Sequence, residues 1–430
     1  MKLAIIGSGI SGLVVAHRLH RQHDLTIYEA GSHIGGHTRT LTVDHEGRKV
    51  PVDTGFIVFN TRNYPRFTAL LDELGVPSQS TTMSFSVRDD AVRFEYGGGS
   101  LNAIIAQRRN LLRPRFWRMI AGFRRFAREA PRAIETGDEW TKLGDYLARE
   151  RYPDPFRDHL IVPMAAAIWS TPDADILNLP LGFFVRFFEN HGMLSVRRRP
   201  VWRTIVGGSR AYVDRLTAPF RERIRLNSPV LSVARSEHGV TVRTAREESE
   251  FDEVVLACHA DQSLRLLADP SPAEREILGH LPYRPNEAVL HSDESLLPAR
   301  RRAWSAWNYA ARSSPGTGAH EGVAVTYDME ILQRLGVRRH LCVTLNDSGS
   351  IDPGAVIDRH TFEHPAFDAA AIRAQLRHAE ISGVNRTHYC GAYWFNGFHE
   401  DGVRSAERVV DHISRTHQQT QSSRQLVASM

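Results

Sequence analysis

The sequence predicts an α/β protein, and three consecutive features near its N-terminus predict it. Residues 2–6 form a short apolar run that is typical of a buried strand. Residues 7–12 follow as a GxGxxG turn, and residues 13–19 have the apolar spacing of a helix. Residues 25–28 form a second strand-like run, which ends on Glu29. This order of strand, glycine turn, helix, strand and acid is that of a Rossmann-type domain, which binds a dinucleotide.

Each residue of this unit has its own physical role in a dinucleotide site. Gly7 allows the tight turn, Gly9 lets a pyrophosphate approach the backbone, and Gly12 lets the helix pack closely on the strand. Together with Ser11 they open a helix whose free N–H groups and positive dipole end favour phosphate. Glu29 lies 20 residues after Gly9, where an acid can bind the ribose hydroxyls of adenosine. The alternative is a glycine turn in an ordinary βαβ unit.

A second glycine pair, Gly35 and Gly36, follows Glu29 closely. This pair resembles an extension found in FAD oxidoreductases of the amine oxidase and phytoene desaturase superfamily, in which the loop wraps the pyrophosphate. The superfamily usually has an arginine after the pair. Here His37 takes that place and Arg39 comes two residues later, so either residue can meet the phosphate. The resemblance implies FAD as the cofactor, because an NAD enzyme has no need for this loop.

Two further segments carry the same resemblance. In the superfamily an Asp-x-Gly segment lies under the flavin, and residues 53–60 match it, with Gly55 allowing close approach of the backbone. The alternative is a turn at the end of a strand. Residues 200–212 contain a strand and a Gly-Gly pair that opens a helix, as in the superfamily. Val230 matches a valine that the superfamily places against the adenine.

The last matching segment is residues 389–406. A strand is expected to enter at Gly391, and a helix is expected to begin near Gly402. The N-terminus of that helix can stabilise negative charge on the reduced flavin. The resemblance implies cofactor contacts at Gly391, Asp401, Gly402 and Val403. The acid that usually follows the strand glycine in the superfamily is missing here.

The matching blocks, residues 3–60, 200–260 and 389–410, imply a Rossmann-type FAD-binding domain of the glutathione reductase kind with a discontinuous α+β substrate domain. We expect the FAD-binding domain to comprise residues 1–75, 200–285 and 380–416. We expect the substrate domain to comprise residues 76–199 and 286–379. Residues 417–430 are polar and are expected to form a flexible tail.

The remaining elements follow from apolar periodicity. Helices are expected over residues 63–75, 139–150, 159–169 and 177–188. The last two of these helices are strongly apolar and can form either core or the wall of an apolar tunnel. Strands are expected over residues 41–43, 49–53, 84–96, 240–242, 254–257, 288–291 and 323–327.

Composition excludes several classes of protein. The chain has 430 residues, of which 42% are hydrophobic and 24% charged. It contains no apolar run of about 18 residues that could span a bilayer, and no signal peptide is recognised at its start. Cys258, Cys342 and Cys390 are scattered, which fits a reducing cytoplasm and supports neither a disulfide framework nor a metal site. We therefore expect a cytoplasmic protein, with peripheral attachment to the inner membrane as an open alternative.

One segment is strongly basic. Residues 108–132 contain nine arginines and one acid, Glu129, with aromatic and aliphatic residues between them. Residues 116–130 fit an amphipathic helix with a basic face. Such a helix suits an anionic membrane surface, where each basic residue contributes about 1 kcal/mol. It also suits a solvated arginine face over an ordinary core. Nucleic acid is not expected as a partner, because no recognition fold accompanies the charge.

Within the superfamily, the chain resembles a bacterial branch of amine oxidase-like NAD/FAD-binding proteins associated with modification of membrane fatty acids, including desaturation of methyl-branched acyl chains. Residues 53–60, 304–309 and 399–405 carry this likeness. It implies an FAD-dependent oxidoreductase, a desaturase or dehydrogenase, that moves a hydride from a hydrophobic substrate such as a lipid acyl chain to flavin N5. The alternatives are an FAD amine oxidase of a small amine and a non-catalytic FAD-binding partner of a lipid-modifying complex.

The positions of the lysines favour a desaturase or dehydrogenase of an acyl chain over an amine oxidase. Many amine oxidases of the superfamily place a lysine near flavin N5, whereas Lys2, Lys49 and Lys142 lie in unsuitable segments here. An apolar tunnel that opens beside residues 108–132 would support a lipid substrate. A compact cavity with an aromatic pair and a carboxylate would support an amine, and a flavin covered by side chains would support a non-catalytic role.

The candidate catalytic residues are His399, as a base, and Tyr309. The alternative for His399 is a histidine that caps a helix or lies on the surface. Candidate substrate contacts are Trp202, Trp394 and Phe398. The electron acceptor cannot be identified from the sequence.

Overall fold

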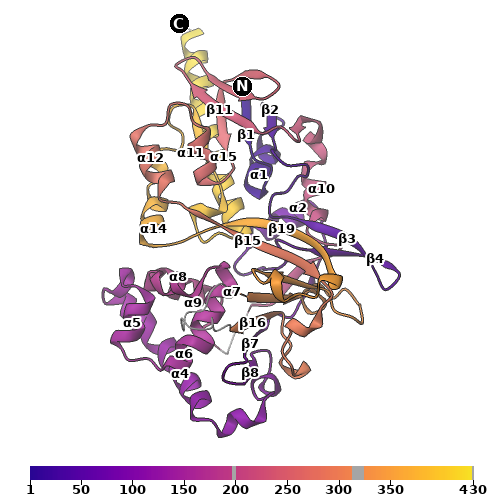
Figure 1. The fold of residues 1–430 in the computed structure, drawn as a ribbon. Helices are drawn as coiled ribbons and strands as arrows, with labels where there is room; N and C mark the ends of the chain where they lie inside the picture. Colours follow the sequence, from indigo (N-terminus) through magenta and orange to yellow (C-terminus); the bar gives the residue numbers. More distant parts are fainter. Residues whose placement is uncertain (196–199, 312–323, 429–430) are drawn as a thin grey trace.

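The structure is a computed structural model that describes residues 1–195, 200–311 and 324–428. The predicted mixed α/β fold is confirmed. A five-stranded sheet lies in the part of the molecule that contains both chain ends, and a seven-stranded sheet and a layer of helices form the opposite part (Figure 1).

The five-stranded sheet is parallel and has the order β10-β2-β1-β14-β20. Its strands are β1 (Lys2–Ile6), β2 (Asp24–Tyr28), β10 (Ile224–Arg225), β14 (Glu253–Leu256) and β20 (Thr387–Tyr389). The central strand β1 is buried on both faces from Leu3 to Ile6, as its continuous apolar run requires. All five strands fall within the three sequence ranges expected for the FAD-binding domain, so segments far apart in the chain build one sheet.

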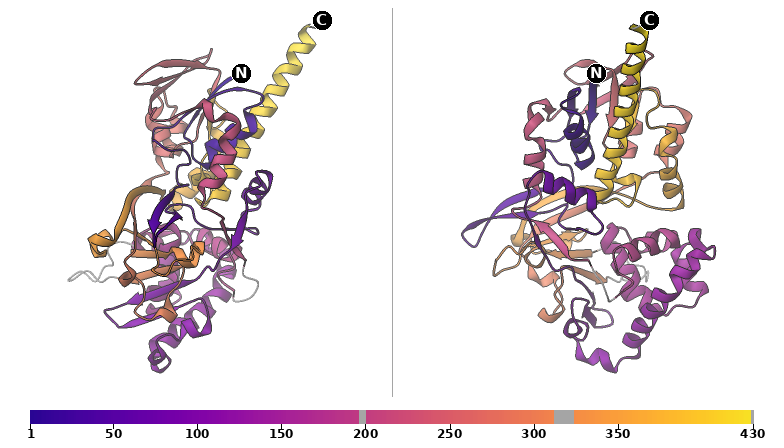
Figure 2. Two further views of the ribbon diagram at one scale, coloured as in Figure 1. Left: turned by 90° about the vertical axis from the view of Figure 1, so that its right-hand side faces the viewer. Right: turned by 180° about the vertical axis from the view of Figure 1, so that it is seen from behind.

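Both faces of this sheet are covered. One face carries α1 (Ile10–Leu19), α10 (Arg210–Thr217) and α15 (His399–Ala428), which share one apolar core with it. The other face carries a small antiparallel sheet of β11 (Val230–Arg235), β12 (Val240–Thr244) and β13 (Glu248–Phe251), with α11 (Ala260–Leu266), α12 (Pro272–Gly279) and α14 (Ala369–Leu376). Helix α15 packs along α1, which brings the last long element against the first one (Figure 2).

The seven-stranded sheet has the order β19-β15-β18-β17-β16-β7-β8 and is antiparallel except for the pair β16 and β7. Its strands are β7 (Phe85–Asp89), β8 (Phe94–Gly97), β15 (Tyr283–His291), β16 (Trp307–Ala311), β17 (Ala324–Asp328), β18 (Cys342–Leu345) and β19 (Val356–Pro365). The long strands β15 and β19 reach from this sheet toward the five-stranded one (Figure 1).

Helices from the middle of the chain pack beside this sheet around a second core. They are α3 (Leu101–Ile104), α4 (Pro114–Glu135), α5 (Leu143–Arg149), α6 (Asp154–Phe156), α7 (Val162–Trp169), α8 (Asp173–Asn178) and α9 (Leu181–Asn190). Smaller elements join the two parts of the molecule. They are the hairpin of β3 (Thr40–His45) and β4 (Arg48–Asp53), the sheet of β5 (Phe59–Asn60), β6 (Ser78–Ser80) and β9 (Trp202–Ile205), and the helices α2 (Pro65–Glu73) and α13 (Met329–Gln333).

Several expected boundaries are wrong. The helix expected over 139–150 begins only at Leu143, and the helix expected over 159–169 is a π-helical turn, Arg157–Ile161, followed by α7. Pro163 lies in the first turn of α7, which continues the π-helical turn, and the carbonyl oxygen of His159, four residues earlier, accepts a hydrogen bond from the hydroxyl of Tyr96 (2.7 Å) in place of the missing N–H. The last helix begins at His399, three residues before the expected start at Gly402.

The C-terminal segment also differs from expectation. Residues 417–428, expected to be a flexible tail, continue α15 as a helix that extends past the five-stranded sheet (Figure 2). The segment contains neither glycine nor proline, so its sequence has no stop signal for a helix. Across the described parts of the chain, no helix combines the length and the apolar character that crossing a bilayer requires.

Candidate functional site

A cavity of about 620 Å³ lies between the two large sheets. The glycine turn after β1 and the end of β2 form one part of its wall, and β16, β17, β18 and β19 form another. The ends of α7 and of the segment before α15 complete it. The cavity therefore connects the predicted dinucleotide site with the part of the chain predicted to hold the substrate.

The glycine turn leaves open space where a ligand can lie. Gly7 has a φ of +108°, and a Cβ atom there would lie 2.8 Å from the carbonyl oxygen of Ala257. A Cβ atom on Gly12 would lie 2.1 Å from the carbonyl oxygen of Gly7, so the helix packs directly on the turn. A Cβ atom on Gly9 would meet no atom within 4 Å, and Gly9 lines the cavity. Two of the glycines thus permit close packing, and Gly9 faces the space beside it.

Glu29 is held rigidly at the edge of this space. One carboxylate oxygen accepts hydrogen bonds from the backbone N–H of Ser8 (3.0 Å) and from its hydroxyl (2.5 Å). The other oxygen accepts a hydrogen bond from the N–H of Gly31 (2.8 Å). Each carboxylate oxygen has further lone-pair capacity, so the side chain can still accept hydrogen bonds from ribose hydroxyls.

The loop with the second glycine pair separates His37 from Arg39. His37 lines the cavity and stacks on Phe362, with 5.0 Å between ring centroids. Burial, together with the neighbouring His364, holds the pKa of His37 well below its usual range, so its imidazole is neutral. Its Nε2 atom is buried and has no hydrogen-bond partner among the described residues.

Arg39 lies elsewhere. Its guanidinium pairs with the carboxylate of Asp358 at 2.8 Å and does not line the cavity. Of the two residues expected to meet a pyrophosphate, only His37 is at the cavity wall, and it offers a neutral hydrogen-bonding group in place of a charge.

The other predicted cofactor residues divide into two groups. Those that line the cavity with Gly7, Gly9, Glu29 and His37 are Ser11, Gly36, Gly55, Val230 and Gly391. Those that do not line it are Gly12, Arg39, Asp401, Gly402 and Val403.

Asp401, Gly402 and Val403 lie behind the cavity wall because of the way α15 begins. The buried carboxylate of Asp401 accepts hydrogen bonds from the N–H groups of Asn396 (3.2 Å) and Phe398 (3.0 Å), which caps the helix from within. Burial raises the pKa of Asp401 to about 7. A Cβ atom on Gly402 would lie 2.6 Å from the Ile10 side chain, so this glycine serves the contact between α15 and α1.

His399 is buried at the first position of α15. Its ring stacks on Phe56, with 3.5 Å between centroids and 15° between planes. Its Nε2 atom is 3.1 Å from the hydroxyl of Thr38 and 3.2 Å from that of Tyr212. Burial lowers the pKa of His399 to about 3, so the imidazole is neutral near pH 7. It lines the cavity, but its low basicity makes it a weak proton acceptor.

Aromatic and aliphatic side chains form the part of the wall away from the glycine turn. Trp202 and Phe398, two of the three predicted substrate contacts, line this part. The other side chains there were not singled out from the sequence and are Ile168, Trp169, Trp307, Tyr327, Leu345 and Phe367. The sequence predicts a strand over residues 323–327, where β17 lies, but none over residues 307–311, where β16 lies, and it does not predict what Trp307 and Tyr327 face.

Two predicted residues lie away from the cavity. Trp394 is buried beside His378, with 4.5 Å between ring centroids, and is not part of the wall. Tyr309 lies two residues beyond Trp307 on β16, in the core of the helical layer, and its hydroxyl donates to the carboxylate of Asp173 at 2.9 Å. Its position gives no support to a catalytic role, because it does not reach the cavity.

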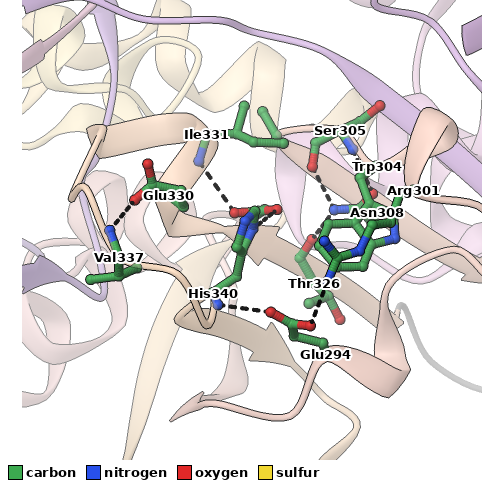
Figure 3. Close-up of polar contacts among 12 residues, drawn as sticks. Glu294, Arg301, Trp304, Ser305, Asn308, Thr326, Glu330, Ile331, Val337 and His340 are labelled. Atoms are coloured by element: carbon green, nitrogen blue, oxygen red, sulfur yellow. Dashed lines mark hydrogen bonds and ion pairs between the residues drawn. The ribbon is translucent and has the colours of Figure 1, made fainter. Parts of the chain in front are cut away.

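A polar network fixes the strands that carry Trp307 and Tyr327 (Figure 3). Asn308, next to Trp307, donates hydrogen bonds from Nδ2 to the carbonyl oxygens of Ser305 (2.6 Å) and Thr326 (3.1 Å). This side chain ties β16 to β17 and to the preceding loop. The two aromatic rings therefore keep a fixed relation, with 5.5 Å between centroids and 82° between planes.

A buried ion pair extends this network. Asp328, next to Tyr327, is fully buried, and its carboxylate lies 2.7 Å from Nδ1 of His340. That hydrogen bond raises the pKa of His340. The N–H of His340 donates to Glu294 at 2.9 Å (Figure 3).

Charged groups at the cavity are few. Besides Glu29, the acidic side chain in the wall is Glu363, whose carboxylate lies 3.2 Å from Nδ1 of His259. Burial lowers the pKa of His259, so this neighbour is neutral near pH 7 and does not balance the charge of the carboxylate. Neither Lys2, Lys49 nor Lys142 lines the cavity, and neither does any residue of the basic segment 108–132. No group of three or more potential metal ligands is found among the described residues.

Comparisons with known proteins agree with this geometry. The sequence profile of the family described as flavin containing amine oxidoreductase matches residues 10–297. Over 344 residues the chain is 26% identical to "Putative flavin-containing monoamine oxidase AofH" of Mycobacterium tuberculosis, which covers 76% of this chain and 70% of that protein.

Solved structures show the same fold. A putrescine oxidase bound to putrescine superimposes with a TM-score of 0.66 at 16% identity, over 96% of this chain and 99% of that one. A CLA-producing fatty acid isomerase from P. acnes gives a TM-score of 0.66 at 16% identity, over 96% of this chain and 98% of that one. At these identities the likeness is one of fold.

Proposed function

We propose, on the premise that this chain belongs to the family of flavin-containing amine oxidoreductases and is an FAD-dependent oxidoreductase, that it dehydrogenates a hydrophobic substrate, a lipid acyl chain. The observation that carries the proposal is the composition of the cavity wall. Beyond the glycine turn many side chains of the wall are apolar or aromatic, and the acidic side chain of the described wall there is Glu363, beside His259.

The residues around the glycine turn fit the adenine dinucleotide part of FAD. Gly9 faces open space, Glu29 is fixed beside it, and His37 has a buried Nε2 atom without a partner among the described residues. When bound, FAD supplies the oxidant, because its N5 atom accepts a hydride from a substrate carbon. The protein then has to bind and orient the substrate and to exclude water.

The apolar part of the wall suits an acyl chain. Trp169, Trp202 and Phe398 come from three different segments, and with Trp307 and Tyr327 they surround the same space. Burying such side chains against a hydrocarbon contributes about 25 cal/mol per Å² of apolar surface, so an alkyl chain gains affinity along its whole length. The same wall excludes water from the reacting carbon.

The charges distinguish the two classes of substrate. A protonated amine needs a carboxylate or an equivalent group, since burial of an unpaired charge costs several kcal/mol. Glu29 is bound to the glycine turn, which leaves Glu363, beside His259, as the acidic side chain of the described wall that is available to an amine. An uncharged acyl chain needs no such partner.

Dehydrogenation of a carbon–carbon bond also releases a proton from the neighbouring carbon. His399 lies at the wall but is a weak acceptor because its pKa is about 3. A methyl branch on the carbon that loses the hydride stabilises positive charge there and lowers the demand for a strong base. The proposal therefore favours branched acyl chains.

A second candidate is oxidation of an amine, and one observation favours it. The rings of Trp307 and Tyr327 meet at 82°, which forms an aromatic corner that can hold an amine or a cation. The relatives named as a monoamine oxidase and a putrescine oxidase agree with this candidate. A tunnel opening beside residues 108–132, which would have supported a lipid substrate, is not found, since none of these residues lines the cavity.

The test compares the two substrate classes directly. The purified flavoprotein is mixed without oxygen with phospholipids that carry methyl-branched acyl chains, and separately with amines that include putrescine, and loss of the oxidised flavin absorbance is followed. We expect reduction by the branched lipid and a product that lacks two hydrogen atoms. Reduction by amines alone would replace the proposal with the second candidate, and a flavin that neither class reduces would indicate a non-catalytic role.

A matched pair of variants ties the result to the cavity. Trp307→Ala should lower kcat/KM at least about tenfold, because it removes a large apolar contact, while the FAD content stays unchanged. Trp140→Ala, at an exposed position away from the cavity, should leave both quantities unchanged. In the organism, deletion of the gene should alter the fatty acids and not the amine pool.

A further inference from the structure

Several exposed apolar side chains belong to segments at the end of the molecule farthest from the C-terminus. Leu101 is 82% exposed, Leu112 87% and Trp117 53%. The indole N–H of Trp117 donates to the carbonyl oxygen of Leu111, itself an exposed leucine, so Trp117 lies beside the turn that carries Leu111 and Leu112. They belong to α3, to the turn Arg108–Leu112 and to the start of α4, at the bottom of all views in Figures 1 and 2. We call residues 101–118 the leucine tip.

The rest of α4 does not share this exposure. Its apolar side chains Phe116, Met119 and Phe126 are buried, in the same core as α6 and α9. The amphipathic pattern of residues 116–130 therefore describes an ordinary helix that covers a core. This face cannot enter a membrane, and the exposed large apolar side chains of the basic segment, Leu111, Leu112 and Trp117, lie within the leucine tip.

Unpaired positive charge surrounds the tip. Glu129, the acid within residues 108–132, pairs with Arg125 and Arg128. Among the described residues, five exposed arginines of the segment have neither an ion pair nor a side-chain hydrogen bond. They are Arg108, Arg115, Arg118, Arg124 and Arg132. Arg109 and Arg113 bond only to backbone carbonyl oxygens.

We propose that the leucine tip docks on the surface of an anionic phospholipid membrane. Leu101, Leu112 and Trp117 enter the headgroup layer, where leucine leaves water and an indole ring sits favourably at the interface. Arg115 and Arg118, which flank Trp117, meet lipid phosphates, for which guanidinium groups are well suited. The tip is separate from the cavity, so this proposal does not rest on the proposed substrate.

The arrangement favours a membrane over other anionic partners. Nucleic acid would use the arginines but would leave both leucines in water, since its backbone offers no apolar surface. An acidic protein would need a complementary apolar pocket for isolated leucines at a projecting end of the molecule. A lipid surface accepts both features at once, because apolar side chains and phosphates meet there within a few ångström.

The test uses the full chain with FAD bound and sedimentation with vesicles. We expect binding to phosphatidylcholine vesicles that contain phosphatidylglycerol, weak binding to phosphatidylcholine alone, and loss of binding at high salt. The double variant Leu101→Ser with Leu112→Ser should bind about tenfold more weakly. Arg115→Gln with Arg118→Gln should lose about fivefold per arginine at low salt.

Matched controls separate the tip from general effects of charge and polarity. Leu376→Ser removes an exposed leucine on α14, and Arg246→Gln with Arg275→Gln removes two exposed arginines elsewhere. Both controls should bind as the wild type does, and all variants should keep the flavin spectrum and thermal midpoint, which shows that they fold. Equal loss in the controls, equal binding to neutral and anionic vesicles, or no vesicle binding together with tight binding to nucleic acid would each overturn the proposal.

A second measurement reports insertion. An environment-sensitive fluorophore attached at Leu112→Cys should shift its emission to the blue when anionic vesicles are added, whereas the same fluorophore at Leu376→Cys should not. Emission at position 112 that does not change although the protein sediments with the vesicles would contradict entry of the tip into the headgroup layer.

Discussion

The imidazole of His399 lies flat on the phenyl ring of Phe56, with 3.5 Å between their centroids. The two residues are far apart in sequence, and their contact joins the start of α15 to the segment that follows β4. The ring is buried, and its Nε2 atom is within hydrogen-bond distance of the hydroxyls of Thr38 and Tyr212, so protonation would place a charge in a poorly solvated site. His399 is therefore a structural part of the cavity wall, and we expect its resistance to protonation to lower the stability of the protein in acid.

We expect His399→Phe to make the protein less sensitive to acid. The folded pKa of His399, about 3, lies below the ordinary value of 6.5, so the unfolded chain binds a proton that the folded chain does not. Stability therefore falls as pH decreases below 6.5. The phenyl ring keeps the stacking but cannot be protonated. Between neutral pH and about pH 4, the free energy of unfolding should therefore fall by up to about 3 kcal/mol less in the variant than in the wild type. Urea unfolding across this range measures the difference. The exposed His238→Gln should follow the wild type, and parallel curves for His399→Phe and the wild type would contradict the expectation.

The opposite sign is expected for His340. Its folded pKa is raised by the hydrogen bond to Asp328, so the stability from this pair is fully present below 6.5 and is lost as pH rises through the raised pKa. His340→Gln should lower the free energy of unfolding by about 1–2 kcal/mol at pH 6 and by much less at pH 9. Thermal unfolding at the two pH values measures this. A loss of equal size at both would show that the charge on His340 does not contribute.

Two glycines of the turn should respond differently to the same substitution. In Gly12→Ala the new methyl would lie 2.1 Å from the carbonyl oxygen of Gly7, so the helix must move and the apoprotein should lose about 3 kcal/mol or more. In Gly9→Ala the methyl meets no atom within 4 Å, so the apoprotein should keep its stability. FAD affinity of Gly9→Ala should fall about tenfold, because the methyl occupies cavity space. Thermal unfolding of the apoproteins and flavin titration separate the two effects. Equal loss of apoprotein stability in both variants would show that Gly9 does not face open space.

Glu29→Gln should weaken FAD binding without unfolding the protein. The side chain keeps its size, but one of the two oxygens that can accept from the ribose hydroxyls becomes an amide donor, and the negative charge is lost. Loss of a hydrogen bond to a charged acceptor costs about 1–3 kcal/mol, which corresponds to a loss of affinity of about fivefold to more than a hundredfold. The flavin-to-protein ratio and the dissociation constant report it. Glu73→Gln, at a surface ion pair, is the control and should bind FAD normally.

The sequence predicts the cofactor end of the cavity better than the substrate end. The roles of Gly7, Gly9 and Glu29 depend on residues close by in the chain, so a local pattern is enough to predict them. The wall formed by Trp169, Trp307 and Tyr327 brings together α7 and two strands that are far away in sequence. No local pattern records which of these side chains face one another.

Two examples illustrate this limit. Tyr309 shares a strand with Trp307, but the cavity ends before it and Asp173 binds its hydroxyl. Residues 116–130 show a clear amphipathic period, yet the period does not say whether water, lipid or protein covers the apolar side. In this fold α6 and α9 share the core that it enters.

The parallel sheet that carries the glycine turn is closed at one edge by β20 (Thr387–Tyr389), which pairs with β14, and β14 pairs with β1. During synthesis the turn at residues 7–12 therefore emerges from the ribosome long before its sheet can be completed. The nascent chain must keep the apolar strand β1 out of wrong pairings until residues 387–389 have been made. We therefore expect the flavin to be captured only after these residues have left the ribosome.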